Sequence, residues 1–154
     1  NCDGNDGSKS DCDFCAITKD YLKLNDAGED IFKCEKDSTN TMTELTINGV
    51  PLIKRNLEYI FAQSALTKLI LINNEITDET FPSGVTFPTT LSELTITNNK
   101  LTEVPDWIKT SEQKVNLSNN LLSTGLCNSI NGQDGYKGEE FICSLNNSDD
   151  INKL

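Results

Sequence analysis

The chain has 154 residues, and its 24 Asp and Glu against 13 Lys and Arg give a formal net charge of -11 at pH 7. Such a charge repels polyanions and argues against a nucleic-acid partner. The length fits one domain, and the apolar runs are too short to span a membrane, so we expect no membrane insertion of this segment.

The first 41 residues combine four cysteines with a short stretch of helical periodicity. Phe14, Ile17, Tyr21 and Leu22 predict a helical turn, and the apolar residues within 31–34 predict a strand that follows it. The acidic, glycine-rich start could supply calcium ligands, but it does not fit the EF-hand loop, so we expect no metal site.

The middle of the chain contains four copies of the pattern L-x-x-L-x-L-x-x-N-x-L, at residues 42–52, 66–76, 91–101 and 112–122. Alternating apolar positions predict a short strand with one buried face in each copy. Between the first two copies, residues 55–65 have the spacing of a short helix. The residues at the fourth, sixth and ninth positions are predicted to face inward: Leu45, Leu69, Leu94, Val115; Ile47, Leu71, Ile96, Leu117; Asn74, Asn99, Asn120.

This pattern resembles the leucine-rich-repeat family, and the match covers about residues 42–125. The resemblance implies an α/β solenoid, a short horseshoe of about four repeats with a parallel sheet on its concave face. It further implies a disulfide-stapled cap at each end, as in the extracellular members of the family. The expected organisation is one compact domain, with an N-terminal cap at 1–41, four repeats at 42–125 and a C-terminal cap at 126–154.

The cysteines form two even clusters, which favours disulfides in an oxidising compartment over structural zinc or a redox pair. We expect Cys127 to pair with Cys143 and the first four to pair among themselves, with Cys2–Cys15 and Cys12–Cys34 favoured among three connectivities. Two sequons, at Asn116 and Asn146, are candidate glycosylation sites. The six cysteines are Cys2, Cys12, Cys15, Cys34, Cys127 and Cys143.

The concave face of the predicted sheet is the candidate partner-binding surface. Ile70 and Ile72 would form a small apolar spot with a polar rim, although Ile is also simply a good strand residue. At the third repeat position the charge alternates in sign, which favours a ladder of surface salt bridges over a charged stripe for a partner. The other predicted contact residues are Lys68, Asn73, Glu93, Thr95, Thr97 and Asn98.

The sequence favours a binding protein over an enzyme. Without His, classical Ser-His-Asp and Cys-His sites are impossible, and we expect no cofactor. The resemblance implies a secreted or cell-surface module that recognises an extracellular protein or glycan. Inhibition of a secreted hydrolase is the alternative, and ice or surface binding by the Thr-rich face is a remote one.

Overall fold

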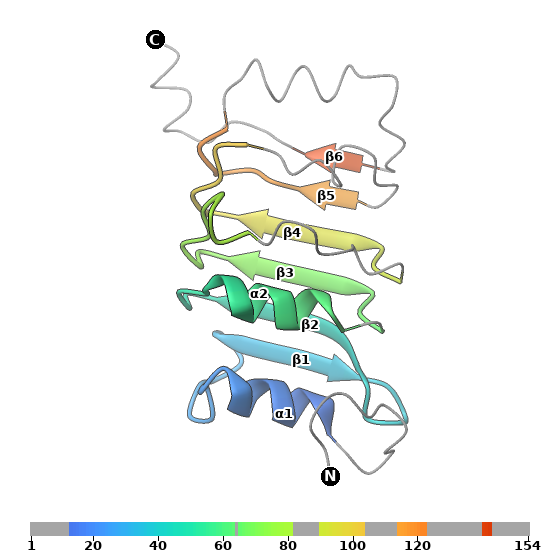
Figure 1. Cartoon of the computed structure of the whole chain (residues 1–154). Helices are drawn as coiled ribbons and strands as arrows, with labels where there is room; N and C mark the ends of the chain where they lie inside the picture. Colours follow the sequence, from blue (N-terminus) through green and yellow to red (C-terminus); the bar gives the residue numbers. More distant parts are fainter. Residues whose placement is uncertain (1–12, 64, 82–89, 104–113, 123–139, 143–154) are drawn as a thin grey trace.

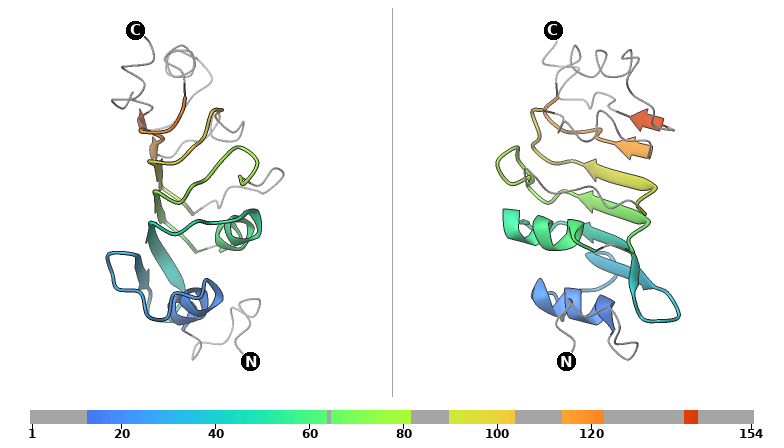
Figure 2. Two further views of the ribbon diagram at one scale, coloured as in Figure 1. Left: turned by 90° about the vertical axis from the view of Figure 1, so that its left-hand side faces the viewer. Right: turned by 45° about the vertical axis from the view of Figure 1, so that its right-hand side comes forward.

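The computed structural model describes residues 13–63, 65–81, 90–103, 114–122 and 140–142, with backbone only for the last three. Their six strands form one sheet in chain order, with β1 antiparallel to β2 and every later pair parallel (Figure 1). Figure 2 shows both helices on the same side of this sheet. The elements are α1 (Phe14–Tyr21), β1 (Phe32–Lys36), β2 (Met42–Asn48), α2 (Lys54–Phe61), β3 (Lys68–Ile72), β4 (Glu93–Thr97), β5 (Lys114–Asn116) and β6 (Glu140–Ile142).

The predicted fold class, an all-parallel leucine-rich-repeat solenoid, is wrong. The sheet is mixed, because β1 turns back through a tight loop and pairs antiparallel with β2. In the part of the chain that the structure describes, only α2 is a helical connection between parallel strands. Over the described residues, the structure is therefore a small α/β fold with a mixed sheet and two helices. The apolar pattern predicted the parallel strands but contained no signal for the direction of β1.

The buried face of the sheet is the one that the apolar pattern predicts. In β3, Leu69 and Leu71 are fully buried, whereas the residues on either side of them are only partly buried. Helix α2 covers this face with Leu57, Ile60 and Phe61, as its helical spacing predicts. The inward residues of the consecutive strands pair directly, Leu45 with Leu69 and Leu69 with Leu94, so each apolar row runs across the sheet.

The N-terminal part is held by a helix cap and a disulfide. Asp13 caps α1 by accepting a hydrogen bond from the Ala16 amide, and it also pairs with the Lys36 ammonium, which lowers the pKa of Asp13. Cys15 of α1 is bonded to Cys34 of β1, with Cα atoms 5.8 Å apart.

This disulfide corrects the predicted connectivity. The pairings Cys2–Cys15 and Cys12–Cys34 are wrong, because the packing of α1 on β1 brings Cys15 and Cys34 together. The other four cysteines lie outside the described residues, and so does Asn146.

The turn from β1 to β2 is organised by one carboxylate. Asp37 accepts hydrogen bonds from the backbone amides of Thr39 and Thr41 and from the Thr39 hydroxyl. These bonds, with that from the Thr39 hydroxyl first, lower the pKa of Asp37. Asn40 completes the turn with a φ of 63°, a conformation that Asn tolerates better than most residues.

Buried asparagines join each parallel strand segment to the next. The Asn99 amide oxygen accepts from the backbone amides of Asn74 and Ile76 at 2.8 and 3.1 Å. Its amide nitrogen donates to the carbonyls of Leu71 and Thr97. Asn120 repeats this one segment later, accepting from the Leu101 amide and donating to the carbonyls of Ile96 and Leu117.

The two faces of β3 should respond differently to truncation. We expect Leu71→Ala to lower the free energy of unfolding by about 2–5 kcal/mol, because it opens a cavity in a fully buried site. Ile70→Ala, on the other face of the same strand, should cost about 1 kcal/mol or less. Urea denaturation of both variants measures this, and equal losses would show that the faces are wrongly assigned.

Candidate binding site

The candidate binding surface is the sheet face opposite the helices, called the open face here. The register places Thr46, Ile70, Thr95 and Asn116 in one row across β2 to β5. A second row consists of Asn48, Ile72 and Thr97, across β2 to β4. The structure therefore places four of the predicted contact residues, Ile70, Ile72, Thr95 and Thr97, in these two rows.

Ile70 and Ile72 are half-buried rather than fully exposed. Their neighbours in the register are Thr46 and Thr95 for the first, and Asn48 and Thr97 for the second. Thr97 has only 8% of its surface exposed, so it contributes less contact surface than its predicted role requires.

A row of alternating charge crosses the same face. Glu44, Lys68, Glu93 and Lys114 are register partners in succession. The Lys68 ammonium and the Glu93 carboxylate are 3.8 Å apart, and both side chains are about two-fifths exposed. An exposed pair of this kind contributes at most about 1 kcal/mol, but opposite charges in register disfavour a shifted alignment of the strands. The structure thus gives Lys68 and Glu93 a role within the sheet.

Asn73 and Asn98, also predicted as partner contacts, have a conformational role. Both are exposed and follow directly after a strand, with φ of 55° and 56°. Gly49 and Asn119 occupy the same position in the other segments, also at positive φ. Gly and Asn adopt this left-handed conformation with less strain than most other residues. The recurrence of Gly and Asn at the eighth repeat position is the feature of the sequence that indicates a positive φ there.

Asn116 lies on the open face at the C-terminal side of this surface. Its side-chain oxygen accepts hydrogen bonds from the backbone amide and the hydroxyl of Ser118. These bonds join the first and the third residue of the sequon. Asn116 is the register partner of Thr95, which in turn pairs with Ile70. A group attached to Asn116 would therefore stand two strands away from Ile70, about 10 Å.

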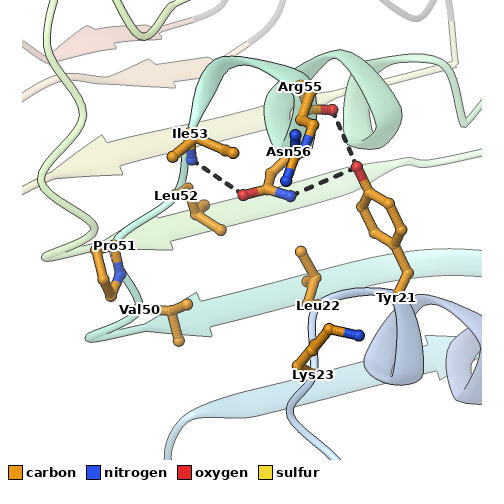
Figure 3. Close-up of a pocket in the computed structure, with 9 residues that line it drawn as sticks. All are labelled: Tyr21, Leu22, Lys23, Val50, Pro51, Leu52, Ile53, Arg55 and Asn56. Carbon is orange, nitrogen blue, oxygen red and sulfur yellow. Dashed lines mark hydrogen bonds between the residues drawn. The ribbon is translucent and has the colours of Figure 1, made fainter.

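Sequence reasoning missed a cavity of about 370 Å³ on the helix side of the molecule, called the α1–α2 pocket here. It lies between the C-terminal end of α1 and the segment that leads into α2 (Figure 3). No repeat pattern could have predicted it, because it joins two segments far apart in the sequence. The lining residues are Tyr21, Leu22, Lys23, Val50, Pro51, Leu52, Ile53, Arg55 and Asn56.

Comparison of the chain with protein-family models, with curated proteins and with solved structures finds no match. Neither of the helices in the described ranges is long and apolar enough to cross a membrane.

The conformational role of Asn98 predicts a specific order of variant stabilities. We expect Asn98→Gly to change the free energy of unfolding by less than about 0.5 kcal/mol, since Gly accepts positive φ freely. Asn98→Val should lower it by about 1–2 kcal/mol, because a side chain branched at Cβ is strained there.

Thr95, three residues earlier within β4, provides the matched control. At this position Val should be tolerated better than Gly, because it is a strand position. Thermal unfolding of the four variants measures both orders. If Gly and Val rank the same way at the two positions, the assigned role of Asn98 is wrong.

Proposed function

We propose that this protein is a recognition module, not an enzyme, and that it binds another protein through the open face around Ile70 and Ile72. The observation that carries the proposal is the composition of this face. Within strands β2–β5, Ile70 and Ile72 are the only apolar side chains on it. Their inward neighbours Leu69 and Leu71 already fill the core, so the core does not require Ile at either position.

The surroundings of the two isoleucines support a protein partner. Thr46 and Thr95 flank Ile70, and Lys68 and Glu93 lie one row away. An apolar centre with a hydrogen-bonding rim is the usual composition of a protein interface, and the centre carries most of its binding energy. The face also consists of paired strands, which change shape little on binding and so lose little entropy. A glycan partner and inhibition of a secreted hydrolase are the alternatives from the sequence, and no contact in the structure favours either.

An extracellular location is part of the proposal. The Cys15–Cys34 disulfide supports it, since disulfides persist in oxidising compartments. The sequon at Asn116 is consistent with the same location. A glycan there would cover the β5 side of the open face and restrict the partner to the side of β1–β4. The leucine-rich-repeat resemblance adds an expectation of extracellular recognition, on the repeat pattern alone.

The test replaces both isoleucines. Ile70→Asp with Ile72→Asp should lower the affinity for the partner by at least about 100-fold, because two charges would be buried in the centre of the interface. Partners are defined as proteins that cross-link to the immobilised wild-type chain and then bind it as purified proteins in a calorimeter.

The matched control places the same two charges elsewhere. Ile53 and Leu121 are exposed apolar residues outside the open face, at 47% and 52% exposure. Ile53→Asp with Leu121→Asp should leave the affinity unchanged. Ile70→Thr with Ile72→Thr keeps the branched side chains that strands favour, and should weaken binding without lowering the melting temperature. Unchanged affinity in a folded variant of Ile70 and Ile72 would refute the proposed surface.

A further inference from the structure

The α1–α2 pocket combines apolar walls with positive charge. Val50, Pro51 and Ile53 supply aliphatic surface, and Lys23 and Arg55 supply the charge. No acidic residue lines this pocket, although acidic residues outnumber basic ones 24 to 13 in the chain. The pocket is therefore a basic spot on an acidic protein, and its charge selects anions.

The two cations are available to a ligand. Neither Lys23 nor Arg55 forms a salt bridge with any residue of the described ranges, whereas Lys36 and Lys68 are paired with carboxylates. Asp20 and Asp26 are the acids nearest to Lys23 in sequence, and neither forms a salt bridge with it; Asp20 accepts a hydrogen bond from Asn25 instead. An unpaired cation beside an apolar wall pairs with an anionic ligand without first breaking an existing ion pair.

The wall of the pocket is fixed before a ligand arrives. The ring of Tyr21 stacks on Tyr59 with centroids 4.3 Å apart. As Figure 3 shows, the Tyr21 hydroxyl donates a hydrogen bond to the Arg55 carbonyl and accepts one from the side-chain nitrogen of Asn56. The side-chain oxygen of Asn56 accepts a hydrogen bond from the Ile53 backbone amide. These bonds tie the end of α1 to the start of α2, so a ligand need not pay for ordering the two segments.

We propose that the α1–α2 pocket binds a small organic carboxylate with an apolar body. The carboxylate pairs with Lys23 and Arg55, and the apolar body packs on Val50, Pro51 and Ile53. A bare inorganic anion would leave the aliphatic walls unused, and a neutral apolar compound would leave both cations unpaired. The volume of about 370 Å³ lies in the lower part of the range for small-molecule sites. This site is separate from the open face and does not depend on the proposed protein partner.

The experiment titrates the whole folded chain with 4-phenylbutyrate and with its uncharged isostere 4-phenylbutyramide, followed by amide NMR shifts. For a ligand of about a dozen heavy atoms we expect a Kd of about 1 mM for the carboxylate. The shifts should centre on the amides of Lys23, Ile53 and Asn56. The neutral amide should bind at least about fivefold more weakly, because it cannot pair with the two cations.

Two double variants remove the same charge at different places. Lys23→Asn with Arg55→Gln should weaken binding of phenylbutyrate at least about fivefold, and Asn suits the φ of 60° at position 23. Lys33→Gln with Lys100→Gln removes two charges outside the pocket and should leave the Kd unchanged. The spectra of both variants away from the pocket report that they are folded. Equal affinity for the acid and the amide, an equal effect of the two double variants, or no saturable shifts at the pocket would overturn the proposal.

Discussion

After β3, β4 and β5 the chain must turn towards the core with backbone amides and carbonyls buried. Such groups need partners, and an orphaned one costs about 1–3 kcal/mol. The side chains of Asn99 and Asn120 supply these partners, each from one segment to the segment before it. We expect the alignment of β3, β4 and β5, and with it the order of their rows on both faces, to depend on this arrangement. At the N-terminal end the arrangement is incomplete, because the buried Asn74 oxygen has no hydrogen-bond partner in the described ranges.

The proposed binding surface follows from that alignment. Because the segments match residue for residue, the side chains of the open face form rows across the strands. In these rows the neighbours of Ile70 and Ile72 on β2 and β4 are threonines and an asparagine, not further apolar residues. The alternating row that contains Lys68 and Glu93 opposes a shift of one strand against the next. On the helix side, by contrast, the connections between the parallel strands differ from one another. Only one connection in the described ranges is helical, and its start near the end of α1 creates the pocket beside Tyr21.

Sequence reasoning predicted what repeats along the chain and missed what does not. The inward leucines, the buried asparagines and the strand positions recur at the same places within each copy of the pattern, so their burial follows from period two and the position in the repeat. The direction of β1 and the Cys15–Cys34 bond depend on how one unique segment packs on another, which no periodicity encodes. The outward repeat position of Asn98 predicts a partner contact, but it contains no information on the backbone conformation that Asn98 adopts. The α1–α2 pocket required the contact of two distant segments.

The most direct test of this account is the free energy of unfolding of Asn99→Ala compared with Asn74→Ala. Asn99 makes four buried hydrogen bonds through its side chain, so its removal should cost at least about 2 kcal/mol. The Asn74 side chain makes one, to the Val50 carbonyl, and its removal should cost clearly less. Asn48→Ala, at an exposed position of the open face, provides the baseline. A loss for Asn99→Ala no larger than that of Asn48→Ala, or equal losses for Asn99 and Asn74, would contradict the central role of the buried asparagines.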